Sequence, residues 1–303
     1  MSRRAHGAAA ALVLAAALLA AGPCRAMSFE VCDRAREPSA DEKDVMLRFG
    51  AIVREELAAA DQDVALIARS GLDLHRLDVR YSHEGIALKD SAASPWAVRE
   101  LYYSCEDHRP RVFDEGLAGF LLGTDDPRTS WASLVFLPPE AAATLRDAAL
   151  DRRRSLAVLG ASYSANAYAF STVHQNCNQW VMELIAGAWG APDAGREASQ
   201  RWLREQGYLP TVFTASAHPM TWLADLVPWL ANDDHPAEEI AHDRYNVSMP
   251  ASIETFVRAK AAGATRMEFC HAGRHVVIHE GWSDIAEGCV AGPGDRVVEL
   301  EAD

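Results

Sequence analysis

Apolar residues recur at intervals of three and four along several stretches of the chain, the spacing that places side chains on one side of an α-helix. The first such stretch follows Ser39-Ala-Asp-Glu42, and its apolar positions are Val45, Met46, Phe49, Ile52, Val53 and Leu57. The same criterion predicts helices over residues 113–122, 139–154, 177–189, 198–206 and 253–262. Shorter apolar runs separate these segments, so the pattern does not describe an all-helical protein.

The shorter runs have the length and composition of β-strands. They lie at residues 64–69, 79–88, 96–103, 131–137, 156–159 and 165–170, and residues 267–279 predict a hairpin that turns at Ala272-Gly273. Alternation along 79–88 places Tyr81 and His83 on one face, where Gly85 leaves room for a ligand or another backbone. Strands joined by hairpins pair antiparallel, so we predict an α+β fold with an antiparallel sheet.

The first 26 residues have the pattern of a secretory signal peptide. Arg3 and Arg4 precede an apolar stretch, which ends in the cleavage signal Cys24-Arg25-Ala26. The stretch of about 14 residues is short for a bilayer span, so we expect export to the periplasm and no integral membrane span. Prolines punctuate the chain from about residue 209. We therefore predict a signal peptide at 1–26, a main domain at 27–208 and a C-terminal extension at 209–303.

The charge balance of the chain is acidic, with a net charge of −14. Residues 1–26 contain three arginines and no acid, so the remainder has 26 basic and 43 acidic side chains and a net charge of −17. Phosphate backbones and anionic lipid surfaces repel such a chain, and we expect no nucleic-acid partner.

Five cysteines follow the signal peptide, and an odd number leaves at least one thiol unpaired within the chain. Cys270 and Cys289 lie in the same C-terminal region, whereas Cys32 and Cys105 both lie in the N-terminal half. Our hypothesis is that each of these two sets forms a disulfide in an oxidising compartment, which leaves Cys177 free.

Cys177 lies in the first turn of the helix predicted over 177–189, and Asn176 before it is suited to cap that helix. Free N–H groups and the positive end of the helix dipole stabilise a thiolate at this position. Two interpretations remain open. Cys177 is a nucleophile with a base nearby, or it is an inert buried thiol, as most free cysteines are.

His83 is the best candidate for that base, because a strand would fix its ring and Gly85 would allow close approach. The alternative is a structural histidine held by hydrogen bonds.

Two short motifs contain these candidates, Ser82-His-Glu-Gly-Ile-Ala-Leu88 and Asn176-Cys-Asn-Gln-Trp-Val-Met-Glu-Leu184. The first is similar to the Ser-His-x-Gly strand motif, and the second to the cysteine helix, of the permuted NlpC-like papain-fold proteins, which include YiiX-type bacterial proteins and lecithin retinol acyltransferase. Together with Trp202-Leu-Arg-Glu-Gln-Gly-Tyr-Leu-Pro-Thr211, both segments also resemble an uncharacterised family of exported proteobacterial proteins.

The resemblance implies a permuted papain-like sheet packed against the cysteine-bearing helix, with Cys177 as nucleophile and His83 as base. It also implies that the backbone N–H of Cys177 belongs to the oxyanion site. Members of the group orient the histidine with a polar residue on the next strand, for which Glu100 and His108 are the candidates here. Other residues expected at the oxyanion site or in the cleft are Gln175, Gln179, Asn178 and Tyr163.

Histidines at 271, 275 and 279 suggest a metal site. His275 and His279 would share a strand face, but strand rise separates them by ~13 Å, too far for one ion. We therefore predict no metal and no cofactor.

These features predict a periplasmic thiol hydrolase or acyltransferase that acts on an amide, ester or thioester in an envelope peptide or acyl substrate. The alternative is a non-catalytic envelope protein that binds a peptide or lipid in the papain-like groove. Aromatic residues would then matter more than the thiol, and these are Trp96, Tyr102, Tyr163 and Trp180.

Overall fold

The computed structural model describes residues 38–72, 74, 77–104, 108–190, 195–214 and 229–301. The chain divides into Met1–Glu30 and Val31–Asp303, and all described residues belong to the second unit. The predicted signal peptide and the predicted pairing of Cys32 with Cys105 therefore lie outside the described residues.

Both helices and strands occur throughout the described residues. The helices are α2 (Ala40–Ala59), α3 (Leu117–Leu122), α4 (Pro139–Leu150), α5 (Arg152–Ala157), α6 (Cys177–Trp189), α7 (Arg196–Glu205), α8 (Ala237–Ala241) and α9 (Pro250–Lys260). The strands are β1 (Val64–Arg69), β2 (His83–Leu88), β3 (Ala97–Ser104), β4 (Arg109–Glu115), β5 (Thr129–Phe136), β6 (Thr211–Thr214), β7 (Arg244–Val247), β8 (Thr265–Ala272), β9 (His275–Glu280) and β10 (Arg296–Glu299). Among the described helices, none is both long enough and apolar enough to cross a bilayer.

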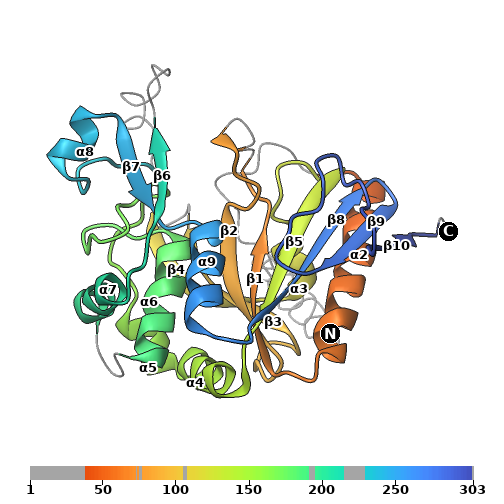
Figure 1. Cartoon of the computed structure of the whole chain (residues 1–303), viewed down its shortest axis with the longest axis horizontal. Coiled ribbons are helices and arrows are strands. Elements are labelled where there is room, and N and C mark those ends of the chain that lie inside the picture. The colour runs from red at the N-terminus through yellow and green to blue at the C-terminus, as the bar shows by residue number, and fades with distance from the viewer. Residues whose placement is uncertain are drawn as a thin grey trace, which may run out of the picture. The chain divides into compact units, whose positions relative to one another are not determined.

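An eight-stranded sheet organises this unit, with the order β10-β9-β8-β5-β1-β2-β3-β4 (Figure 1). All its neighbouring strands are antiparallel, which confirms the predicted α+β class with a large antiparallel sheet. The predicted hairpin over 267–279 is also confirmed: β8 and β9 pair around Gly273, whose positive φ of 58° suits the turn. Because β8 pairs with β5, residues beyond 209 extend the same sheet.

Helices cover both faces of the sheet, and strand alternation sorts the side chains between them. Leu66, Ile86 and Leu101 pack with α4, α6 and α9 on what we call the α6 face. Ile67 follows Leu66 in β1, and Ala87 follows Ile86 in β2. Both pack with α2 and α3 on the opposite face, which we call the α3 face. Helix α6 contacts β2 and β3 of the sheet and helix α9 (Figure 1).

Some segments differ from the sequence prediction. Residues 109–115 form edge strand β4, so the helix predicted over 113–122 is confined to α3. Residues 152–157 form α5, where the apolar run at 156–159 predicts a strand. The reason is local, because the Asp151 side chain accepts from the backbone N–H groups of Arg153 and Arg154 and starts a helix. Residues 165–170 form a loop with an isolated bridge at Tyr168 rather than the predicted strand.

Candidate functional site

Cys177 is the first residue of α6, and Asn176 caps the helix as the sequence predicts. The Asn176 side-chain oxygen accepts from the backbone N–H of Gln179 at 2.7 Å. The Cys177 thiol is free and only 4% exposed, and its Sγ lies 3.5 Å from the Asn178 side-chain oxygen. The thiol therefore belongs to a well-formed helix start, but it is packed into the core of the α6 face.

The side-chain amides of Gln175, Asn178 and Gln179, near Cys177, form hydrogen bonds with backbone groups. Gln175 accepts from the Gly160 N–H at 2.7 Å, and Gln179 donates to carbonyls of the loop over 168–171. Asn178 donates to the Ser82 carbonyl at 3.1 Å. These hydrogen bonds give the three residues a role in fixing the loop and the helix start, and each of them is buried.

Glu183 is the centre of a buried network that sequence reasoning missed. Its carboxylate is 0% exposed and accepts from Arg196 at 2.8 Å, from Gln175 at 2.7 Å and from Gln200 at 2.6 Å. Burial raises the pKa of Glu183 to about 7, although Arg196 acts to lower it. The remaining guanidinium nitrogens of Arg196 donate to carbonyls of the loop over 171–174. A charged residue inside the apolar helix 177–189 was the available sequence signal.

His83 begins β2 and lies on the α3 face. Its ring centroid is 5.7 Å from that of Phe120 in α3, and its Nε2 contacts the Glu100 carboxylate. Glu100 is one of the two residues predicted to orient this ring, and the structure brings the pair together. The other candidate, His108, lies elsewhere, with its Nδ1 3.0 Å from the Tyr103 hydroxyl.

Glu115 and Arg69 complete a group with His83 and Glu100 that we call the His83 cluster. Burial, followed by the negative charge of Glu100, raises the pKa of Glu115 to about 8, whereas Arg69 and His83 act to lower it. Arg69 is buried, donates to the Gly123 carbonyl and lies 5.2 Å from the Phe120 ring centroid. A carboxyl that keeps its proton at neutral pH can share it with a neighbouring carboxylate. The cluster thus couples a carboxyl pair to an imidazole.

Among the described residues, Cys177 and His83 share no hydrogen bond, and their side chains pack with different groups of residues. Cys177 packs on the α6 face, as do Ile86 and Leu88 of β2. Because side chains alternate along a strand, His83 shares the opposite face with Ala87.

Two residues near His83 lie away from its face, Glu84 because side chains alternate along β2 and Tyr81 because it precedes the strand. Glu84 follows His83 in β2, and its side chain is buried on the α6 face. Burial, followed by the negative charge of Glu254, raises the pKa of Glu84 well above its usual range. Tyr81 lies before β2, donates to Glu268 and packs with Trp131, so the expectation that it shares a face with His83 is wrong.

The aromatic residues singled out from the sequence fall into two groups. Trp180 and Trp96 are buried core residues, at 0% and 4% exposure. Tyr163 is half-buried and stacks on Tyr103, with ring centroids 5.1 Å apart and an interplanar angle of 28°. Tyr102 is also half-buried and forms an edge-to-face pair with Phe113 of β4 at 5.8 Å. Only the second group offers aromatic surface to a ligand.

Residues 56–257 match the family described as uncharacterized protein conserved in bacteria (DUF2145). The chain belongs to this family. The match includes Cys177, His83 and Glu100, whereas β8, β9 and β10 lie beyond it. No curated protein and no solved structure matches the chain. The family description names no activity, and the papain-like relationship stays a prediction.

The described part of this family member contains no group of three His, Cys, Asp or Glu side chains arranged to hold a metal ion. The histidines of the C-terminal hairpin have separate partners. His275 contacts Glu299 at 2.5 Å, His279 contacts Asp295 at 2.6 Å, and His271 contacts the Gly273 carbonyl at 3.1 Å. Cys270 and Cys289 form a disulfide, which confirms the pairing hypothesised for them.

Proposed function

We propose that this protein is an exported envelope protein that binds a peptide or acyl ligand, and that Cys177 is a buried structural thiol. The observation that carries the proposal is the placement of His83, which contacts Glu100 on the α3 face while Cys177 packs on the α6 face. A thiol nucleophile needs a base within hydrogen-bond reach. A binding role needs no such pair.

The His83 cluster and its aromatic neighbours are the ligand site we propose. Phe113 lies directly opposite Glu100 in the β3–β4 register, and Tyr102 pairs with Phe113 edge to face. Half-buried rings beside a few buried polar groups are typical of small-ligand sites, since the rings supply apolar contact and the polar groups fix orientation. Here the carboxyls and His83 would orient amide or amine groups of a peptide.

Alkylation of Cys177 by iodoacetamide tests the thiol part of the proposal. The alkylation rate should be the same in wild type and in His83→Ala at every pH measured. His108→Ala is the matched control, because this histidine contacts Tyr103 instead of Glu100. A rate already high near pH 6, which His83→Ala lowers and His108→Ala does not, would overturn the structural role.

Isothermal titration with soluble peptidoglycan peptides and acylated peptides tests the binding part. Glu100→Gln and Tyr102→Ala should each weaken binding about tenfold, the loss expected for one good polar or aromatic contact at about 1.4 kcal/mol. Binding that both variants leave unchanged would place the ligand elsewhere.

A thiol hydrolase or acyltransferase is the second candidate, and one observation favours it. The free Cys177 thiol sits at an Asn176-capped helix start that Asn178 ties to the Ser82 carbonyl, next to His83 in the chain. On this reading Cys177→Ala abolishes activity and leaves stability nearly unchanged. A structural thiol predicts instead a loss of about 1 kcal/mol in the free energy of unfolding, because a packed group is removed.

A further inference from the structure

Three side chains at the C-terminal edge of the sheet form a continuous hydrogen-bonded relay. The carboxylate oxygen Oδ1 of Asp295 lies 2.6 Å from Nδ1 of His279, and Nε2 of His279 lies 2.8 Å from the hydroxyl of Ser283. An ionised carboxylate only accepts, so Nδ1 carries the proton and Nε2 accepts from the Ser283 hydroxyl. This is the order of atoms found in serine hydrolases.

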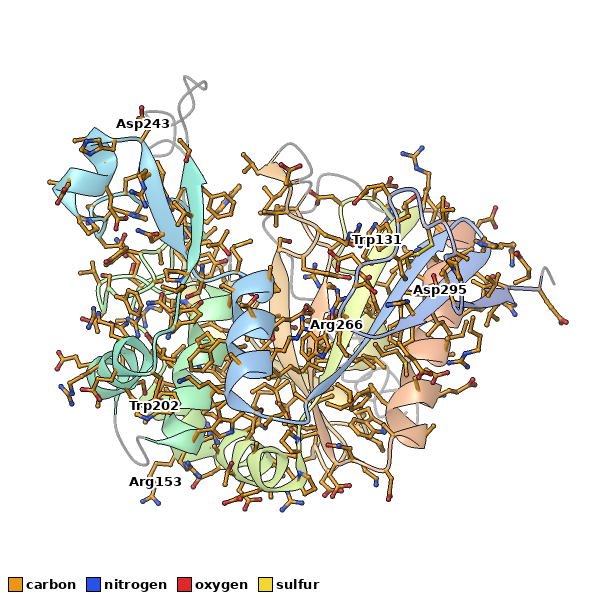
Figure 2. The ribbon with its side chains drawn as sticks, viewed as in Figure 1. Trp131, Arg153, Trp202, Asp243, Arg266 and Asp295 are labelled. Carbon is orange, nitrogen blue, oxygen red and sulfur yellow. A yellow bond between two sulfur atoms is a disulfide. The ribbon has the colours of Figure 1, made fainter. Side chains whose placement is uncertain are left out.

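The relay passes from shielded to open positions. The Asp295 side chain is 5% exposed, the His279 side chain is 21% exposed, and Ser283 is exposed. Burial acts to raise the pKa of Asp295, but the Gly292 N–H at 2.7 Å and His279 together hold it below its usual range. The carboxylate is therefore ionised and fixed where it orients the imidazole, and Figure 2 shows Asp295 beside β9 and β10.

The elements around the relay hold it in place and leave its reactive nitrogen approachable. His279 is on β9, which is paired on both sides, by β8 and β10. Arg266 donates to the Ser283 carbonyl at 3.2 Å and so fixes the turn that carries the hydroxyl. Gly281 has a φ of 137°, and a Cβ there would lie 3.2 Å from His279 Nε2. Glycine thus keeps space beside this nitrogen that a side chain would fill.

We propose that Ser283 is a nucleophile, His279 its general base and Asp295 the positioning residue of a site that hydrolyses carboxylic esters. The Ser283 oxygen bonds to the acyl carbon while its proton passes to His279 Nε2. The bond to the alcohol then breaks, and the leaving oxygen takes that proton. Water, activated by the same nitrogen, attacks the acyl-serine and releases the acid, and the proton returns to Ser283. The site shares no residue with the proposed ligand site and does not rest on it.

A second Ser–His–Asp set in the chain provides an internal comparison. The Ser162 hydroxyl lies 2.9 Å from His174 Nδ1, and His174 Nε2 lies 2.7 Å from Asp233. In this set the Asp233 side chain is 72% exposed. Water screens an exposed carboxylate, which therefore orients an imidazole less firmly than a shielded one. We accordingly assign the nucleophile to Ser283 and use Ser162 as the control.

The test is labelling of the folded, oxidised protein with an alkyl fluorophosphonate, with the modified residue identified by peptide mass spectrometry. Wild type should be labelled at Ser283, and urea-unfolded protein should not be. Ser283→Ala should abolish labelling, whereas Ser162→Ala should leave it unchanged. Asp295→Asn should lower the maximal labelling rate at least a hundredfold and leave the half-saturating probe concentration unchanged, because it disturbs the tautomer and not access.

Each contrary result overturns the assignment. Folded wild-type protein that is not labelled would show that the Ser283 hydroxyl is not activated, and so would labelling that persists after unfolding. Labelling at Ser162 would transfer the site to the other set. A rate that Asp295→Asn leaves unchanged, in a variant with the wild-type circular dichroism spectrum, would reduce the relay to hydrogen bonds of the turn. None of these results bears on peptide binding at the His83 cluster, so the two proposals fail separately.

Discussion

Glu115→Gln is expected to remove a large part of the pH dependence of folding stability. The folded-state pKa of Glu115 is about 8, raised first by burial and then by Glu100, against an ordinary value of 4.5. Between these two pH values the folded chain keeps a proton that the unfolded chain releases. The contribution of Glu115 to the free energy of unfolding is therefore fully present below pH 4.5 and is lost as the pH rises to about 8. At about 1.4 kcal/mol for each pKa unit the full loss is about 5 kcal/mol, and we expect about half of it because Glu115 is only partly buried.

Urea unfolding at pH 5 and pH 8.5 measures this effect, since glutamine has no proton to release. The variant and the wild type should have similar free energies of unfolding at pH 5, and the variant should be about 2–3 kcal/mol more stable at pH 8.5. Glu140→Gln is the matched control, because Glu140 is exposed on α4 and should give the wild-type pH dependence. The reasoning is refuted if Glu115→Gln and wild type lose stability in parallel between the two pH values.

Three further predictions concern what holds the fold around the sites. Arg196→Met removes the guanidinium paired with the buried Glu183 carboxylate and should lower the free energy of unfolding in urea by about 3–5 kcal/mol. Arg201→Met, on the exposed side of α7, should change it little. Replacing Cys270 and Cys289 by serine opens a loop with a sequence separation of 19 and should lower the free energy of unfolding by about 3 kcal/mol. Equal unfolding midpoints for the variant and the wild type would contradict this. Gly85→Ala puts a Cβ 2.5 Å from Val98 Cγ1 and should lower the free energy of unfolding by about 1–3 kcal/mol. Gly187→Ala in α6 should be tolerated or stabilising, because a Cβ there meets nothing within 4 Å.

Sequence periodicity and capping residues together located two of the longer helices. Helix α2 begins at Ser39, where a capping box with Glu42 forms as the spacing suggests, and α6 begins at the predicted Asn176 cap. Edge strand β4 was missed because its outer side faces water, so charged residues interrupt any apolar alternation. The strand predicted at residues 156–159 is wrong because an apolar run alone does not distinguish a short helix from a strand. The Asp151 cap favours the helix here.

The contact between His83 and Glu100 followed from the expectation of a polar residue on the neighbouring strand, but the face on which they lie did not. A period of two shows that His83 and Gly85 share a face. It does not show which face meets α6, because every residue of β2 is buried. The sequence likewise did not predict the Ser283 relay, since its members are separated by 4 and 16 positions across irregular segments. Of its three members, the sequence analysis considers only His279, as a possible metal ligand that strand spacing then excludes.

Glu84 allows a test of whether the α6 face provides a base for Cys177. It is the β2 residue on the α6 face next to His83, its Oε2 is buried without a hydrogen-bond partner, and burial raises its pKa well above the usual range. Because burial favours the protonated carboxyl, Glu84 is a poor acceptor for the proton of a thiol and does not take the place of an imidazole base. Glu84→Gln should then leave both the Cys177 alkylation rate and the stability at pH 7 close to wild type. A variant that alkylates much more slowly would show that Glu84 is ionised and assists the thiol, which would return the α6 face to consideration as a catalytic surface.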